Sequence, residues 1–303
     1  MNNRKLVTGA VLVFIGLLVV FVLRVPVPVH DLNQTNGMIV SSGQKREYLL
    51  YVPRSYDRAK PTPLVICLHG AALSPAAQME ISQWNNMADE HGLIVVYPSG
   101  TGFPRYWPTD PGSLELNVRF ISDLIDKLEA TYSIDPARIY ANGLSNGGEM
   151  TFALSCTLSY RIAAVGTVAA AQLLPFDWCK DSRPVPMITF HGTADRFAPY
   201  KGGSSSFAPG IFPSVRTWTA NWARRNRCGP NPVDSAVASD VTRLEYLNCA
   251  EDAAVVLYTV QGGGHTWPGG EPVPGWFVGP TTRSIDASSV MWEFFVQHQL
   301  RRK

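Results

Sequence analysis

The sequence predicts an α/β fold in which a mostly parallel sheet carries helices on both faces. Its strand-like runs are almost continuously apolar, which is typical of strands that are buried from both sides. These runs alternate along the chain with helix-like segments, the pattern expected of a covered parallel sheet. A Gly-x-Ser-x-Gly sequence at residues 143–147 lies where one such strand passes into a helix.

The first elements predict a hairpin and a buried strand. Residues 38–41 and 47–52 are short β-like runs, and the Ser-Gly-Gln sequence between them favours a turn. Residues 64–68, with the sequence Leu-Val-Ile-Cys-Leu, form a continuous apolar run. We expect this run to lie inside the parallel sheet.

A helix, a strand and a second helix follow. Ser74 and Pro75 combine an N-cap with a first-turn proline, so a helix is predicted from there to about residue 91. Residues 93–97 are the next apolar strand. Residues 116–132 have the period of a helix with one apolar face, made of Val118, Ile121, Ile125 and Leu128.

The remaining elements repeat these two patterns. Further strands are predicted at residues 138–142, 163–169, 185–190 and 254–260. Further helices are predicted at residues 149–156, 215–225 and 285–300, the last capped by Asp286. No repeat and no second domain boundary follows residue 31, so residues 31–303 are predicted to form one domain.

The composition argues against several classes of function. The formal net charge of the 303 residues is only +2, which gives no indication of a nucleic-acid partner. The sequence contains no metal-binding or phosphate-cradling motif. Neither a metal nor a cofactor is therefore expected.

The N-terminal segment predicts a membrane anchor. Residues 6–23 carry no charge and lie between Arg4, Lys5 and Arg24. As a helix they span about 27 Å, close to the hydrocarbon thickness of a bilayer. We favour an uncleaved transmembrane helix, with residues 1–30 as anchor and stalk, over a cleaved signal peptide, because no Ala-x-Ala site follows the run. The cations before it favour a cytoplasmic N-terminus and an exported main domain.

The five cysteines agree with export. Cys67 lies within an apolar strand and is interpreted as a buried free thiol. The other four are an even set without metal-type spacing, which favours two disulfides. Of the three possible pairings we favour the sequential one, Cys156 with Cys179 and Cys228 with Cys249. Four reduced cysteines are the alternative.

The sequence Gly-Leu-Ser-Asn-Gly-Gly at residues 143–148 predicts a nucleophilic serine. A turn between a strand and a helix strains the backbone of Ser145 and presents its hydroxyl above the edge of the sheet. The neighbouring glycines leave room for the close approach of strand and helix. The helix N-terminus behind the serine favours developing negative charge.

A serine hydroxyl needs a base, usually a histidine that a carboxylate orients. Most histidines lie in the stalk, on helices or directly at strand ends, and elimination leaves His265, in a glycine-rich loop after the strand at residues 254–260. Asp195 lies just past the strand at residues 185–190 and is the predicted acid. The chain order Ser145, Asp195, His265 is that of the α/β-hydrolase arrangement.

The oxyanion that forms in such a reaction needs backbone N–H donors. One is expected from Asn146, the residue after the nucleophile. The other is expected from Ala71, in the loop after the strand at residues 64–68.

Taken together, the chain resembles the polyhydroxybutyrate depolymerase/feruloyl esterase group of α/β-hydrolases, of the exported bacterial depolymerase-lipoprotein type. The matching sequences are Leu-His-Gly at 68–70, Tyr-Pro-x-Gly-Thr-Gly at 97–102, the serine turn at 143–148, His-Gly-Thr-Ala-Asp at 191–195 and Gly-His-Thr-Trp-Pro-Gly at 264–269. They span most of residues 45–298. The resemblance implies Ser145, Asp195 and His265 as nucleophile, acid and base, the same oxyanion donors, and paired cysteines.

The chain also departs from this group in ways that bear on the substrate. Asn117 stands where the group usually has Asp in an Asp-Val-x-Phe sequence. No lipid-attachment cysteine, Thr-rich linker or polymer-binding module is found, so we expect soluble or short-chain esters rather than crystalline polymer. Loop aromatics near the predicted site are candidates to line an aryl or acyl pocket: Tyr106, Trp107 and Trp267, and also Phe103, Trp276 and Phe277.

The sequence thus predicts an exported, membrane-anchored serine esterase that acts on short-chain, hydroxyalkanoate or feruloyl-type esters, or a secreted one if the N-terminal segment is cleaved. Its partners would be a small or oligomeric ester and the membrane, and not nucleic acid. The alternatives are an acyltransferase that uses the same triad, a non-catalytic binding module with a hydrolase fold, and a peptidase.

Overall fold

The computed structural model describes residues 34–170, 173–179, 183–208, 210–271 and 273–301. Its main strands are β1 (Gly37–Ser41), β2 (Gln44–Tyr51), β3 (Thr62–Leu68), β4 (Ile94–Pro98), β5 (Ile134–Leu144), β6 (Ala164–Val168), β7 (Met187–Gly192), β10 (Val233–Ala238), β11 (Val241–Tyr246) and β12 (Val255–Val260). A separate short pair consists of β8 (Gly203–Ser204) and β9 (Ile211–Phe212).

The helices lie between these strands along the chain. They are α2 (Pro75–Ser82), α3 (Trp84–His91), α4 (Pro111–Thr131), α5 (Asn146–Thr157), α6 (Val215–Arg225), α7 (Gly275–Val278) and α8 (Ala287–Val296), with short 3₁₀ helices η1 (Phe176–Trp178) and η2 (Ala250–Asp252). None of the helices in the described part of the chain has both the length and the apolar character needed to cross a bilayer. The predicted membrane helix at residues 6–23 lies outside the described residues and stays a prediction.

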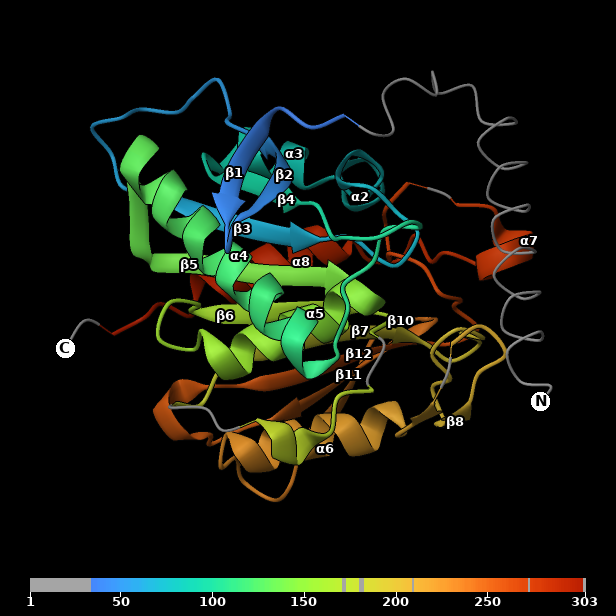
Figure 1. The fold of residues 1–303 in the computed structure, drawn as a ribbon. Helices are drawn as coiled ribbons and strands as arrows, with labels where there is room; N and C mark the ends of the chain where they lie inside the picture. The colour runs from blue at the N-terminus through green and yellow to red at the C-terminus, as the bar shows by residue number, and fades with distance from the viewer. Residues whose placement is uncertain (1–33, 171–172, 180–182, 209, 272, 302–303) are drawn as a thin grey trace.

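Ten strands form one sheet in the order β1-β2-β4-β3-β5-β6-β7-β12-β11-β10 (Figure 1). The pairings from β4 through β3, β5, β6 and β7 to β12 are parallel. The strands outside β4 and β12 are antiparallel to their neighbours. The predicted α/β fold with a mostly parallel central sheet is therefore confirmed.

The central strands are buried on both faces. On β3, Leu64, Ile66 and Leu68 contribute to one core, and Val65 and Cys67 to the other. Helices α4, α5 and α6 cover the first core, and α2, α3 and α8 cover the second (Figure 1). Two covered faces explain why these strands are continuous apolar runs rather than alternating ones.

The single helix predicted from residue 74 to residue 91 is wrong, because it is two helices. Ser74 caps α2 as expected, since its side chain accepts a hydrogen bond from the N–H of Ala77 (3.1 Å). Gln83 then adopts the left-handed conformation (φ 57°) and separates α2 from α3. Its side chain donates to Glu80 O (2.7 Å) and accepts from Asn86 Nδ2 (2.9 Å). These local bonds stabilise a break that apolar periodicity does not reveal.

The hairpin of β10 and β11 is an element that the sequence did not predict. β10 forms the edge of the sheet, and its side chains are mostly exposed. An exposed edge strand lacks the apolar run by which the buried strands were identified. A disulfide between Cys228 and Cys249 joins the segments that enter and leave this hairpin.

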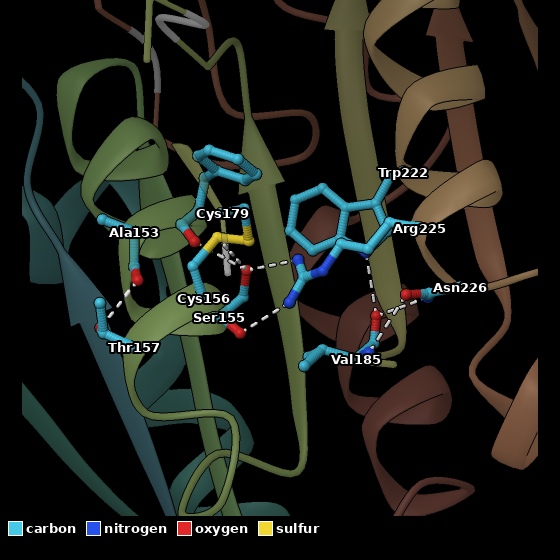
Figure 2. Close-up of a disulfide and its surroundings, with 10 residues drawn as sticks. Ala153, Ser155, Cys156, Thr157, Cys179, Val185, Trp222, Arg225 and Asn226 are labelled. Atoms are coloured by element: carbon cyan, nitrogen blue, oxygen red, sulfur yellow. Dashed lines mark hydrogen bonds between the residues drawn. A yellow bond between two sulfur atoms is a disulfide. The ribbon is translucent and has the colours of Figure 1, made fainter. Parts of the chain in front are cut away.

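The predicted cysteine pairing is confirmed by both disulfides, and Cys67 is the buried free thiol. Figure 2 shows Cys156, near the end of α5, bonded to Cys179 after η1. Arg225 of α6 donates to the carbonyl oxygen (2.7 Å) and to Oγ (3.0 Å) of Ser155. The far end of α5, the helix that follows the serine turn, is thus fixed by a disulfide and by a partly buried arginine.

Candidate active site

Ser145 occupies the strained turn that the sequence predicts. Its φ of 55° and ψ of −121° lie in a region that side chains other than glycine rarely adopt. Its N–H donates to Val168 O of β6 (2.9 Å). A Cβ at Gly147 would lie 2.4 Å from Leu68 O and 2.5 Å from His69 O. Only glycine therefore fits where α5 begins against the end of β3.

The structure brings Asp195 and His265 into direct contact. His265 Nδ1 lies 2.8 Å from Asp195 Oδ2, and the carboxylate is buried. Its other oxygen, Oδ1, accepts hydrogen bonds from the N–H groups of Phe197 (2.8 Å) and Ala198 (2.9 Å). The contact forms because Asp195 follows β7 and His265 follows β12, which are adjacent parallel strands that end at the same edge.

Ser145 follows β5, which ends at this same edge of the sheet (Figure 1). Only β6 separates β5 from β7, so these two strands lie roughly 10 Å apart. The three residues predicted as a triad therefore come from the carboxyl ends of three parallel strands. This edge is where loops of such sheets carry functional side chains.

A second histidine, His191, contacts the acid, and sequence reasoning had assigned it no role. Its Nε2 lies 3.3 Å from Asp195 Oδ2 and 2.7 Å from Ala198 O. Burial by itself raises the pKa of Asp195, but the charge of His265 and the hydrogen bonds from both histidines outweigh it and hold that pKa well below its usual range. Asp195 is therefore ionised and can stabilise a cationic imidazole. The only hint of this contact in the sequence is that His191 and Asp195 are four residues apart.

The loop after β3 lies against the serine turn. A Cβ at Gly70 would be 3.4 Å from Ser145 Cβ. The N–H of Ala72 donates to Arg105 O (2.6 Å), and the N–H of Leu73 donates to Gly70 O (3.2 Å). The N–H groups of Ala72 and Leu73 are thus used within the protein. The donor predicted for the oxyanion is the preceding N–H in this loop, that of Ala71. The second predicted donor, Asn146, is the first residue of α5.

The ring of His69, a residue that the sequence places at the end of a strand, holds the same loop. Burial lowers the pKa of His69 to about 4, so the ring is neutral at pH 7. Its Nε2 accepts from the N–H of Gly100 (2.9 Å), and its Nδ1–H donates to Gly70 O (2.8 Å). These two bonds fix the tautomer and tie the loop after β3 to the segment after β4.

Two of the three residues assigned to the substrate pocket need correction. Trp107 is 0% exposed, and its Nε1 donates to His69 O (3.0 Å). Trp267 is 1% exposed, and its Nε1 donates to Ser288 Oγ (3.1 Å). Rings that are enclosed in the protein interior present no surface to a ligand. Tyr106 is 45% exposed and remains a candidate, as do the exposed Phe103 and Trp276.

A stack of aromatic rings begins at His265. Phe197 lies on the imidazole with ring centroids 4.8 Å apart and an interplanar angle of 27°. Phe207 stacks on Phe197 at 4.2 Å, and Phe277 meets Phe197 edge-on at 5.2 Å. Only Phe277 had been named from the sequence.

Asn117, where the resembling group usually has Asp, lies in a buried hydrogen-bond network. Arg46 Nη2 donates to its Oδ1 (3.0 Å), and its own Nδ2 donates to Pro108 O (3.2 Å). The Arg46 guanidinium lies 4.0 Å above the ring of Phe120, and burial lowers its pKa to about 10. The amide thus supports the segment that carries Trp107 and pairs with an arginine that has no carboxylate partner among the described residues.

Glu149 is a buried carboxyl group beside the serine turn that the sequence did not single out. Its Oε1 accepts from the N–H groups of Leu174 (2.8 Å) and Leu173 (3.2 Å). Burial raises the pKa of Glu149 to about 7, opposed by these bonds and by a bond from Asn146. The Asn146 side chain also bonds the N–H (2.6 Å) and the carbonyl (3.0 Å) of Trp107. Glu149 and Asn146 thereby connect three loops around Ser145.

Replacing Glu149 with Gln should remove a pH-dependent loss of stability. The unfolded carboxyl group ionises near pH 4.5, whereas the folded one keeps its proton to about pH 7. The unfolded state therefore binds fewer protons in this window, and rising pH costs the wild type roughly 3 kcal/mol of unfolding free energy. Urea unfolding at pH 4.5 and pH 8 should show the variant gaining about that much relative to wild type at the higher pH. The control is Glu115→Gln, which changes an exposed carboxyl group. The expectation would be contradicted if the difference in unfolding free energy between Glu149→Gln and wild type were the same at both pH values.

Within the described part of the chain, no group of three or more His, Cys, Asp or Glu side chains could hold a metal ion. The contact of His265 with the buried Asp195 carboxylate is of the kind in which a histidine moves a proton beside a fixed carboxylate.

Comparison with known proteins finds several esterases among the relatives of this chain. No family model matches the chain. A putative esterase, NocK, of Nocardia uniformis subsp. tsuyamanensis is 28% identical over 299 residues, which cover 89% of this chain and 84% of NocK. Feruloyl esterase B of Piromyces equi is 31% identical over 230 residues, which cover 73% of this chain. The chain spans only 42% of the length of that second protein.

Among solved structures, an acetyl xylan esterase from Aspergillus awamori superposes with a TM-score of 0.60. The match covers 86% of this chain and 98% of the other, with 16% sequence identity. At that identity the likeness shows a shared fold.

Proposed function

The chain belongs to the feruloyl esterase-like α/β-hydrolases, and on this premise we propose that it is an exported serine esterase with Ser145, Asp195 and His265 as its catalytic triad. The observation that carries the proposal is the 2.8 Å contact between His265 Nδ1 and the buried Asp195 carboxylate. It supports the proposal because it occurs at the sheet edge where Ser145 occupies a strained turn.

The proposed reaction proceeds through an acyl-enzyme. Ser145 Oγ attacks the ester carbonyl while His265 Nε2 takes the hydroxyl proton, and Asp195 holds the resulting imidazolium. The N–H groups of Ala71 and Asn146 stabilise the oxyanion, and one such donor typically contributes about 3 kcal/mol. The C–O bond to the alcohol then breaks as His265 returns the proton to the leaving oxygen. Water, activated by the same histidine, releases the acid and restores the serine.

We propose esters of short-chain, hydroxyalkanoate or aromatic acids as substrates. The aromatic stack beside His265 supports a substrate with a planar group, because Phe207, which stacks on Phe197, is 43% exposed. Exposed Tyr106 is a second candidate contact. Aromatic pairs stack in offset or edge-on arrangements, which suits an aryl group such as a feruloyl moiety.

The test of this function is hydrolysis of nitrophenyl esters of graded chain length, methyl ferulate and hydroxybutyrate oligomers. We expect saturable release of acid and alcohol from at least one of these classes. A fluorophosphonate probe should form an adduct that peptide mass spectrometry locates at Ser145. No turnover together with no adduct would overturn the proposal and favour a non-catalytic binding module. New esters formed with an added alcohol acceptor would favour an acyltransferase.

We also propose that residues 6–23 anchor the protein in a membrane with the catalytic domain on the exported side. The uncharged length of this run and its flanking cations support the proposal, and the two disulfides agree with an oxidising compartment. The full chain, expressed in a bacterial host, should stay in the membrane pellet after an alkaline carbonate wash. A soluble product that lacks its N-terminal residues by mass spectrometry would instead indicate a cleaved leader.

A further inference from the structure

A cavity of about 430 Å³ lies beside the loops that carry Asp195 and His265. Its lining includes Thr259 of β12, Thr242 of β11 and Thr193, which follows β7. Three strand spacings separate β5 from β12, which places the cavity roughly 15 Å from the serine turn. The cavity is therefore separate from the position where Ser145 would attack an ester.

The size and lining of the cavity suit a small hydroxylated molecule. Ligand pockets in proteins usually range from about 300 to 1,000 Å³, so the volume fits a molecule the size of a monosaccharide. Four of the lining side chains carry hydroxyl groups, those of Thr193, Tyr200, Thr242 and Thr259. A hydroxyl group can both donate and accept, and therefore matches the hydroxyl groups of a sugar or a sugar-like acid.

Two cations give the cavity a preference for an anion. Lys201 and Arg216 both line it. Among the described residues Lys201 makes no ion pair, and Arg216 pairs only with Asp234 (3.3 Å). The side chains of that pair are 56% and 64% exposed. An exposed ion pair of this kind contributes little free energy to stability, so the Arg216 guanidinium remains available to a ligand.

The cavity is also linked to the loops of the predicted acid and base. Thr193 Oγ1 accepts a hydrogen bond from the N–H of Gly262 (2.8 Å), three residues before His265. Tyr200 bonds Thr259 Oγ1 (2.8 Å), and its ring lies 6.0 Å from that of His191. A ligand in the cavity would therefore touch residues that join the two loops.

We propose that this cavity binds a hydroxylated anion of monosaccharide size, whose carboxylate or phosphate is held by Lys201 and Arg216. The anion forms charge-assisted hydrogen bonds with the ammonium and guanidinium groups, and the hydroxyl groups of the ligand pair with the threonines and Tyr200. This binding activity does not depend on the proposed esterase reaction.

Calorimetric titration of the full chain in detergent tests the proposal with D-glucuronate, glucose 6-phosphate and neutral D-glucose. We expect saturable millimolar binding of at least one of the charged sugars, and affinity for glucose at least about tenfold weaker. The two charged sugars distinguish a carboxylate ligand from a phosphate ligand. Lys201→Gln and Arg216→Gln should each weaken the binding about tenfold.

The matched controls are Lys60→Gln and Arg119→Gln, which remove exposed cations remote from the cavity and should leave binding unchanged. Thermal melting checks that each variant is folded. Absence of saturable binding at millimolar concentrations, or equal binding by Lys201→Gln and the controls, would overturn the proposal. If the Ser145→Ala chain still binds a charged sugar, the proposed anion site is supported, whether or not the protein is an esterase. An active esterase that binds neither charged sugar would overturn this inference alone.

Discussion

Replacing Ser145 with alanine is expected to lower kcat/KM for any ester that the protein hydrolyses by at least about 10³-fold. The substitution removes the hydroxyl oxygen that would form the proposed acyl-enzyme, whereas the proposed oxyanion donors and substrate contacts stay in place. The backbone strain at φ 55° is retained by alanine, so the turn itself should survive. The measurement is steady-state hydrolysis of the best nitrophenyl ester, together with a thermal melt.

The matched control is Ser235→Ala, which removes an exposed serine on the edge strand β10 and should retain full activity. The residual rate of ester hydrolysis by Ser145→Ala should exceed the uncatalysed rate in water, because the proposed donors, the N–H groups of Ala71 and Asn146, would still polarise the carbonyl. Burst kinetics in wild type, absent from the variant, would report the acyl-enzyme directly. A Ser145→Ala protein with wild-type turnover would contradict the proposed mechanism.

Replacing Asp195 with asparagine should reduce kcat by about 10³- to 10⁴-fold, because it forces His265 into the wrong tautomer. The N–H groups of Phe197 and Ala198 both donate to Oδ1. They hold the amide oxygen of the variant on that side and turn its NH₂ group toward His265 Nδ1. Nδ1 must then accept rather than donate, which puts the proton on Nε2, and Nε2 can no longer take a proton from Ser145.

The control for this variant is His191→Asn, since His191 contacts Asp195 but not the imidazole of His265. Its loss of kcat should be about 10² or less. The two variants should also differ in the pH profile, because only Asp195→Asn removes the buried negative charge. An Asp195→Asn protein that lost no more activity than His191→Asn would contradict the role of Asp195 as the acid.

Much of the architecture could be predicted because it is encoded by short-range signals. The bounds of α6 agree with the predicted residues 215–225. Asp286 caps α8 through a bond from the N–H of Ser289 (2.7 Å), as expected. By contrast, α4 begins at Pro111 rather than at residue 116, because Asp110 caps it. That cap lies in a loop where no apolar period drew attention to it.

The candidate site also has features that the sequence could predict and features that it could not. Ser145, Asp195 and His265 were identifiable because each lies in the turn or loop that follows a recognisable strand, and parallel strands bring such positions to one edge. The burial of Trp107 and Trp267 was not identifiable, since a ring in a loop sequence gives no sign of what encloses it. The raised pKa of Glu149 likewise depends on the distant N–H groups of Leu173 and Leu174.

The sequence by itself determined the class of fold, the strained serine turn and the order of the three candidate catalytic residues, and it favoured the cysteine pairing that the structure confirms. These follow from local periodicity, glycine placement and spacing along the chain. Only the tertiary structure decided that His191 also contacts Asp195, that Phe197 stacks on His265 and that Lys201 and Arg216 share a cavity. Each of these depends on side chains from separate segments packing together, and the free energy of such contacts is set by burial and distance in space rather than by neighbours in sequence.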